Sequence, residues 1–284
     1  MVNYNGALRD KNTNLFNHTN RAFRYGDALF EDIRFINGQL IFLEEHYFRL
    51  MASMRILRME IPMDFTMEYL EEKILHTLES NGLLSKSALV TMGVFRNSEL
   101  HLIPSKNTIS YVISVSELND SFYVLHDGAY EVELFRDYFI NCDMLSSLET
   151  NHKSLEVVAS IFAEENNYND CILLNNNKHA VGTIFGTLFL VRENRIKTPP
   201  ISDGAKNSVV RKKLLEIVES LKSYELDEAS ISPFELQKAD ELFLLNTAQG
   251  IRPITKYRKK FYDNTVARDL LGKLNANARL ANLK

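Results

Sequence analysis

The sequence predicts an α+β protein of two domains. Its 284 residues correspond to about two domains at roughly 150 residues each. Segments with helical spacing of apolar residues alternate with short apolar strands along most of the chain. Residues 116–128 lose this periodicity and gain polar turn residues. We therefore expect a small N-terminal α+β domain over 1–118, a linker over 119–128 and a larger mixed α/β domain over 129–284.

Composition and charge exclude several classes of protein. Hydrophobic residues make up 45% and charged residues 25% of the chain, as in ordinary globular proteins. The net charge of -4 gives no electrostatic argument for binding nucleic acid or an anionic membrane. No stretch approaches 18 apolar residues, so no membrane-spanning helix is expected. Cys142 and Cys171 do not form a disulfide framework, and the N-terminus has no apolar signal core, so we expect a cytoplasmic protein.

The N-terminal half is expected to contain a β-hairpin. Asn37 and Gly38 lie between two apolar strands, and this pair is the strongest short hairpin signal. Apolar residues then recur at helical spacing from Glu44 to Met59, and the pattern stops before Pro62. The other elements expected in this half are a helix over 65–79 and strands over 87–94 and 108–115.

The C-terminal half continues the alternation of strands and helices. Ser232 and Glu235 fit a capping box with Pro233 at the first turn, which predicts a short helix. The remaining elements expected in this half are helices over 153–167, 208–222 and 263–280, and strands over 131–135, 170–175, 186–192 and 241–246.

General catalytic motifs do not identify the function. The chain contains no G-x-G-x-x-G, no phosphate-binding G-x-x-x-x-G-K-[ST], no G-x-S-x-G and no H-E-x-x-H. Its seven histidines never pair at the spacing of metal ligands, so no metal site is predicted. These patterns alone predict a soluble protein of two α/β parts and no specific activity.

Five sequence blocks carry a family resemblance. They are NRAFRYGDALFE (20–31), EHYFRL (45–50), NHKSL (151–155), IKTPP (196–200), and ADELF through RPIT (239–255). In this order they resemble the class IV aminotransferases, the fold-type IV enzymes that use pyridoxal 5'-phosphate (PLP). That family includes branched-chain aminotransferase, D-amino-acid aminotransferase and aminodeoxychorismate lyase. The resemblance implies a homodimer, a small amino-containing substrate, and PLP in a cleft between a small and a larger domain.

The resemblance assigns roles to individual side chains. Lys153 matches the lysine that forms the Schiff base with PLP, a role that requires a neutral amine. Arg49 matches the arginine that grips the cofactor phosphate, because a guanidinium can donate two parallel hydrogen bonds. Tyr25 matches a tyrosine on the substrate side of the cleft. Arg96 and His101 are expected on a loop where some relatives bind a carboxylate.

Backbone groups are expected to complete the phosphate site. Val209 and Val210 match backbone donors at the start of a helix, where N–H groups favour anions whatever the side chain. Thr247 and Ala248 match a second phosphate-contacting pair. Ser208 stands where the family usually has glycine, which raises the question of whether the backbone there requires glycine.

Two positions depart from the family at the cofactor itself. Gly182 replaces the glutamate that holds the pyridine nitrogen protonated, and a protonated ring stabilises negative charge at the substrate α-carbon. Glu156 replaces an asparagine near the 3'-oxygen and shares a helix face with Lys153. We expect Glu156 to repel the phenolate oxygen or to pair with Lys153 and keep its amine protonated. An acid–base role, or partial replacement of the missing glutamate, is the alternative.

Three hypotheses follow. The first is a PLP-dependent aminotransferase or aminodeoxychorismate-lyase-like enzyme. The second is a catalytically impaired paralogue that acts as a binding or regulatory dimer. The third is a PLP-independent enzyme that uses Glu156 and Lys153 directly. We favour the first because both the cofactor lysine and the phosphate arginine are present.

Overall fold

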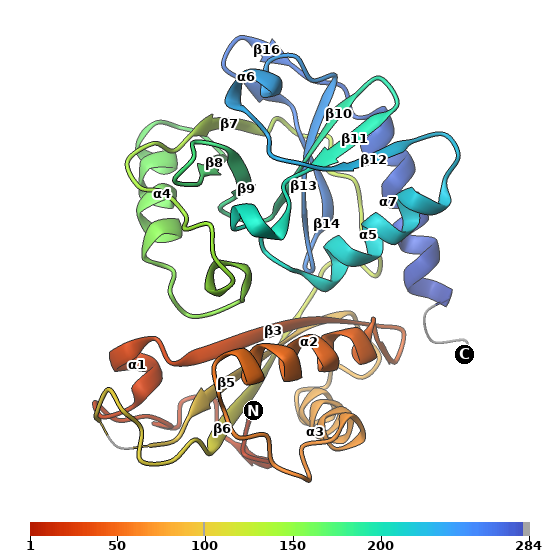
Figure 1. Ribbon diagram of the computed structural model, residues 1–284. Helices are drawn as coiled ribbons and strands as arrows, with labels where there is room; N and C mark the ends of the chain where they lie inside the picture. The colour runs from red at the N-terminus through yellow and green to blue at the C-terminus, as the bar shows by residue number, and fades with distance from the viewer. Residues whose placement is uncertain (99, 281–284) are drawn as a thin grey trace. The chain divides into compact units, whose positions relative to one another are not determined.

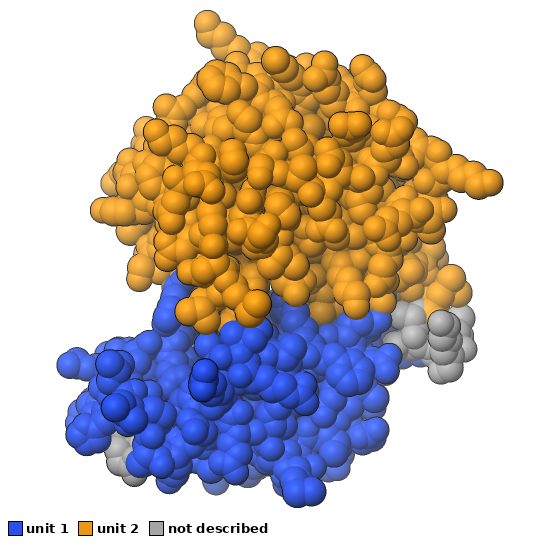
Figure 2. All heavy atoms as spheres, viewed as in Figure 1, with its two compact units in different colours: residues 1–122, 149–152, 281–284 blue, residues 123–148, 153–280 orange. Residues whose placement is uncertain are grey.

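Two compact units make up the structure, a computed structural model that describes residues 1–98 and 100–280. Unit 1 consists of residues 1–122 and 149–152, and unit 2 of residues 123–148 and 153–280 (Figure 2). The chain therefore returns briefly to unit 1 at 149–152, a segment that a single cut at the expected linker does not include. The last four residues of the expected C-terminal domain lie outside the described residues.

Unit 1 is built on a six-stranded antiparallel sheet (Figure 1). Its strand order is β2-β1-β6-β5-β3-β4. The strands are β1 (Val2–Tyr4), β2 (Ala7–Arg9), β3 (Ala28–Ile36), β4 (Gln39–Leu40), β5 (Ala88–Arg96) and β6 (Ile109–Glu117). The predicted hairpin at Asn37 is confirmed as the β3–β4 connection, where both Asn37 and Gly38 have positive φ.

The two faces of this sheet have different environments. Successive residues of a strand point to opposite faces. Val90, Met92 and Val94 of β5 are fully buried on the face that α2 (Leu43–Ile56) and α3 (Met67–Ser80) cover. The other face carries Phe30, Thr91 and Gly93, which line a cavity described below.

Unit 2 contains two five-stranded sheets (Figure 1). Their orders are β12-β11-β10-β13-β14 and β16-β15-β7-β8-β9. The strands of the first sheet are β10 (Thr187–Arg192), β11 (Arg195–Thr198), β12 (Glu225–Glu228), β13 (Glu241–Asn246) and β14 (Gly250–Ile254). Those of the second are β7 (Glu131–Leu134), β8 (Asp170–Leu174), β9 (Ala180–Thr183), β15 (Lys256–Tyr257) and β16 (Lys260–Phe261).

Helices bury the apolar faces of these sheets. Three apolar clusters form the core: one under α5 and α7, one between the sheets, and one under α4. In the first cluster, Phe189 and Phe243 stack with ring centroids 5.0 Å apart and pack with Val210 of α5. The helical segments of unit 2 are η1 (Leu145–Ser147), α4 (Ser154–Glu165), η2 (Ile201–Asp203), α5 (Val209–Ser220), α6 (Pro233–Leu236) and α7 (Thr265–Leu280). Among the described residues, no helix combines the length and apolar character needed to span a membrane.

The longer predicted elements are confirmed within a few residues, and so is the capping box at Ser232. The five-residue helix α1 (Arg21–Tyr25) was missed because it is too short to show periodicity. Its caps are nevertheless visible in the sequence: the Asn20 side chain accepts from the Phe23 N–H, and Gly26 ends the helix at φ 66°. Strands β1, β2, β9, β15 and β16 were missed for the same reason, since each has four residues or fewer.

Candidate active site

Lys153 lies immediately before the first residue of a helix. It occupies the N-cap position of α4, and its side chain is 41% exposed. Its Nζ lies 4.0 Å from Oε1 of Glu156, whose side chain is 17% exposed. The helix therefore places Glu156 beside Lys153, as expected from their spacing in the sequence. At this distance and exposure the pair is a weak ionic contact that orients the amine.

The chain approaching Lys153 is tied within unit 2 to the turn before α5. The Asn207 backbone N–H donates to the Ser147 carbonyl at 3.1 Å. The Lys206 ammonium donates to the Leu148 carbonyl at 2.8 Å. These two bonds connect the turn at 206–208 to the segment that precedes Lys153.

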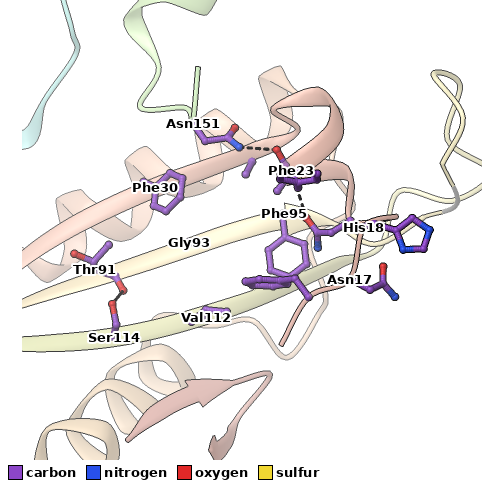
Figure 3. Close-up of a pocket in the computed structure, with 14 residues that line it drawn as sticks. Asn17, His18, Phe23, Phe30, Thr91, Gly93, Phe95, Val112, Ser114 and Asn151 are labelled. Atoms are coloured by element: carbon purple, nitrogen blue, oxygen red, sulfur yellow. Dashed lines mark hydrogen bonds between the residues drawn. The ribbon is translucent and has the colours of Figure 1, made fainter. Parts of the chain in front are cut away.

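The four residues before Lys153 are bonded within unit 1. The Phe30 N–H donates to the Glu149 carbonyl at 2.8 Å. The Asn151 side-chain amide donates to the Ala22 carbonyl at 2.8 Å, the bond drawn beside Phe23 in Figure 3. The chain thus leaves unit 1 at His152 with its direction set by α1 and β3.

The N-terminus of α5 presents two backbone donors. The N–H groups of Val209 and Val210 have no hydrogen-bond acceptor among residues 1–98 and 100–280, and both residues are buried. A helix cannot satisfy its own first N–H groups, so an acceptor must come from elsewhere. The arrangement suits an anion, and especially a phosphate.

Ser208 does not disturb this arrangement. It is the N-cap of α5 at φ −80° and ψ 150°, an extended conformation that any residue adopts. Its Oγ accepts from the Arg211 N–H at 3.2 Å and so satisfies the third donor of the helix. The backbone therefore does not require glycine at this position.

Two turns of unit 2 are hydrogen-bonded to each other. The Asn246 side-chain amide donates to the Phe185 carbonyl at 3.0 Å. This bond joins the β9–β10 turn to the β13–β14 turn, which contains the half-buried Thr247 and Ala248. The β9–β10 turn in turn packs on α4 through Ile184, which shares an apolar cluster with Leu155.

Gly182 lies in β9 opposite Leu173, in tight surroundings. A Cβ built on Gly182 would lie 3.2 Å from the Gly186 carbonyl oxygen. A Cβ built on Gly186 would lie 2.7 Å from the Leu245 carbonyl oxygen, so this position is also restricted to glycine. A side chain at 182 requires the Gly186 carbonyl to shift by a few tenths of an ångström.

A buried carboxylate holds the same turn from the opposite side. Asp170 accepts from the Ile184 N–H at 3.0 Å, the Cys171 N–H at 2.7 Å and the Tyr130 hydroxyl at 3.2 Å. Its side chain is fully buried, and burial raises the pKa of Asp170 from 3.8 to about 6. These bonds leave Asp170 a structural acid that fixes the end of β9.

Arg49 belongs to an ionic cluster in unit 1. Its Nε lies 3.0 Å from both carboxylate oxygens of Glu31, which also contacts His46. Glu31 and His46 are buried, whereas the Arg49 side chain is 16% exposed. Glu31 thus fixes one edge of the guanidinium, and Arg49 as a phosphate ligand stays a prediction.

The expected substrate-side residues lie in unit 1 around Arg21, which stacks over the Tyr25 ring, donates to the His101 carbonyl and shares Asp27 with Arg96. The loop position expected for Arg96 is wrong: Arg96 is the last residue of β5, 7% exposed. Its guanidinium donates to Asp27 at 2.9 Å and to the Arg58 carbonyl at 3.0 Å, so it has a structural role. His101 lies in the exposed connection after β5, and Tyr25 ends α1 half-buried.

A cavity of about 590 Å³ opens on the face of the unit 1 sheet opposite α2 and α3 (Figure 3). Its wall includes Phe30, Thr91 and Gly93 from the strands, and Asn151 from the returning segment. Phe23 of α1, 78% exposed, lies at its edge. The cavity is mainly apolar and contains amide and hydroxyl groups at a few positions.

Comparison with known proteins identifies the family. The family model described as "Amino-transferase class IV" matches residues 28–257. The chain belongs to the class IV aminotransferase family. The aminodeoxychorismate lyase of Vibrio harveyi is 23% identical over 83% of this chain and 84% of its own length.

Solved structures show the same fold. The branched-chain aminotransferase of Thermoproteus uzoniensis, solved with norvaline, superimposes with a TM-score of 0.87 at 22% identity, over 99% of this chain and 95% of that one. The T.th. branched-chain amino acid aminotransferase, complexed with N-(5'-phosphopyridoxyl)-L-glutamate, has a TM-score of 0.84 at 22% identity, over 98% of this chain and 93% of that one. The predicted fold-type IV architecture is confirmed.

PLP has three groups that a protein can contact: the phosphate, the aldehyde and the ring nitrogen. The residues of unit 2 fit the first two of these groups. The acceptor-free N–H groups of Val209 and Val210 suit the phosphate, and the half-exposed amine of Lys153 suits the aldehyde. At the third point, the ring nitrogen, Gly182 supplies no acid.

Three residues hold the surroundings of the candidate site through hydrogen bonds that the sequence did not indicate: His152, Asp170 and Lys206. Each acts through a partner distant in sequence, namely Tyr25, Ile184 and Leu148. A single sequence contains no signal for such pairs. Asp170 was the one that could have been suspected, because a charged residue opens an otherwise apolar strand.

The raised pKa of Asp170 predicts a specific pH dependence of stability. The folded chain holds this proton more tightly than the unfolded chain, so the free energy of unfolding falls as pH rises from about 4 to about 6. A shift of this size corresponds to at most about 3 kcal/mol. Asp170→Asn keeps the acceptor for both N–H groups and removes the titration. We expect urea unfolding at pH 4 to 7 to show a smaller loss of stability in this variant.

The matched control is Asp137→Asn, at an exposed position. Its unfolding free energies should run parallel to those of the wild type across the pH range. If the unfolding free energies of Asp170→Asn also run parallel to those of the wild type across this pH range, Asp170 does not cause the pH dependence.

Proposed function

We propose that the chain is a PLP-dependent enzyme of the class IV family in which the cofactor is attached at Lys153. The observation that carries the proposal is the pair of acceptor-free N–H groups at Val209 and Val210. The turn that precedes them is bonded, through Asn207 and Ser147, to the segment that ends at Lys153. An anion site and a reactive amine are thus connected by one short hydrogen-bonded path.

Each group in this arrangement has a definite chemical task. Val209 and Val210 would hold the cofactor phosphate, assisted by Thr247 and Ala248. Lys153 would hold the cofactor aldehyde through its amine, and the same amine is the group that would move the substrate α-proton as acid and base. When bound, PLP supplies an electron sink next to the substrate α-carbon.

Glu156 and Gly182 bias the reaction. Glu156, 4.0 Å from the Lys153 amine, is placed to orient that amine. Gly182 leaves the ring nitrogen without an acid, which weakens the electron sink. A lyase reaction that needs less stabilisation of negative charge tolerates this better than transamination does. We therefore place an aminodeoxychorismate-lyase-like activity on a small amino-containing substrate ahead of an aminotransferase activity.

A catalytically impaired paralogue is the second candidate. The observation that favours it is the crowding at Gly182, since the backbone of the β9–β10 turn is packed for small residues at both 182 and 186. Such a protein would still bind PLP but would not convert a substrate. A PLP-independent enzyme that uses Lys153 and Glu156 directly is the remaining alternative.

The proposal is tested by the visible absorbance of the protein after incubation with PLP and desalting. Lys153→Ala should abolish the cofactor band because the variant has no amine at the attachment point. Lys212→Ala, which removes an exposed lysine of α5, is the matched control and should retain the band.

If the wild-type protein is as colourless as Lys153→Ala, the proposal of a PLP-dependent enzyme is excluded. Retained colour without turnover, across amino donors and aminodeoxychorismate, would favour the impaired paralogue.

We further propose that the chain acts in the cytoplasm as a homodimer. α4 exposes Val157, Val158 and Ile161 along one side, at 55%, 40% and 50%. A row of large apolar side chains on one helix is typical of a surface that is covered in an assembly.

The dimer is tested by sedimentation velocity. Ile161→Asp places a charge at one end of this row and should shift the wild-type dimer to monomer at micromolar concentration. Phe234→Asp, on the 76% exposed side chain of α6, is the control and should remain dimeric. A monomeric wild type, or a dimer unaffected by Ile161→Asp, would exclude this interface.

A further inference from the structure

The imidazole of His152 lies directly over a glycine. Gly26 ends α1 with φ 66°, and its N–H donates to the Ala22 carbonyl at 3.1 Å. A Cβ built on Gly26 would lie 1.9 Å from Nε2 of His152. The ring can therefore occupy this position because residue 26 has no side chain.

His152 is also hydrogen-bonded at this position. Its Nε2 lies 3.2 Å from the Tyr25 carbonyl oxygen, so the tautomer with the proton on Nε2 donates to the C-terminal end of α1. Helix carbonyls at this end lack partners within the helix, and a donor there is favourable. The ring thus serves as a side-chain cap on α1.

The contact of His152 is the last of four that residues 149–152 make with α1 and β3. Glu149 accepts from the Phe30 N–H, Thr150 forms a β-bridge with Leu29, and Asn151 donates to α1. Figure 3 shows Asn151 pointing toward α1. His152 adds the last contact, one residue before Lys153.

We propose that His152 is a positioning residue, which with Gly26 forms a latch that fixes the direction in which the chain enters Lys153. The inference rests on the proposed role of Lys153. The amine must approach the aldehyde in one geometry, and a displacement of about 1 Å at a reacting group can cost about 100-fold in rate. Because peptide planes are rigid, the backbone of residue 152 determines where the Cα of Lys153 lies.

The latch is tested by His152→Ala and His152→Gln. The alanine variant removes the ring and its hydrogen bond, whereas glutamine keeps an N–H donor of similar reach. Amide hydrogen exchange at residues 150–154 should rise about five- to tenfold in the alanine variant, as expected for one lost hydrogen bond. The glutamine variant should recover most of this protection.

A second readout separates positioning from binding. The rate of PLP attachment, followed by absorbance, should fall about tenfold or more in His152→Ala. Affinity for pyridoxine 5'-phosphate, which carries the phosphate and no aldehyde, should be unchanged. If His152→Ala only disrupted the local structure, both the rate of PLP attachment and the affinity for pyridoxine 5'-phosphate would fall.

A double-mutant cycle tests the contact with Gly26. Gly26→Ala should be more destabilising in the wild type than in His152→Ala, since the methyl group collides with the ring only when the ring is present. Equal effects in the two backgrounds would overturn the latch.

The outcomes also separate this inference from the proposed function. Unchanged exchange in His152→Ala overturns the latch, whatever the cofactor does. A wild type that never attaches PLP overturns the role of Lys153, and with it the positioning role of His152, even where exchange changes as expected. Faster exchange together with slower attachment supports both.

Discussion

The buried N-terminus of α5 imposes the constraint on which the candidate site depends. Three backbone donors begin this helix, and Ser208 satisfies the third one only. Val209 and Val210 are packed into the core of unit 2, so their N–H groups cannot be moved to find other acceptors without disrupting that core. In the proposed function, an anionic ligand would supply the acceptors that the described part of the chain does not.

The same turn connects the proposed anion site to the segment before Lys153. Within unit 2, residues 206 and 207 donate to the carbonyls of Leu148 and Ser147. Within unit 1, the Phe30 N–H donates to the Glu149 carbonyl and Asn151 donates to the Ala22 carbonyl. The backbone is thus hydrogen-bonded up to the residue before α4, which is the pre-organisation that the proposed role of the Lys153 amine requires.

The departures from the family differ in their physical consequences. Ser208 is compatible with the site because its backbone is extended and its hydroxyl caps the helix. Gly182 removes a functional group, and the closeness of the Gly186 carbonyl means that the surrounding turn has adapted to a small residue. In the proposed PLP site, binding of the phosphate and electronic activation of the ring therefore depend on different residues of this chain.

Periodicity and capping predicted the longer elements, because α2, α3, α5 and α7 each bury a regular apolar face. The resemblance then located Lys153, Val209 and Thr247, which lie at element ends within unit 2. Arg96 was expected on a loop where some relatives bind a carboxylate, whereas Asp27 and nearby carbonyls stabilise it at the end of a strand. Contacts such as His152 over Gly26 depend on tertiary packing and lie beyond sequence reasoning.

The central claim is that the N–H groups at the start of α5 bind the cofactor phosphate, and Val209→Pro tests it most directly. Proline is tolerated at the first helical position and follows an extended residue well, so it removes one N–H and leaves the helix intact. Val209→Ala, which keeps the N–H and also loses the valine side chain, is the matched control. Affinity for PLP should fall about tenfold or more in the proline variant relative to the alanine variant, and affinity for pyridoxal, which lacks the phosphate, should be equal in the two. Equal affinity of both variants for PLP would contradict the account.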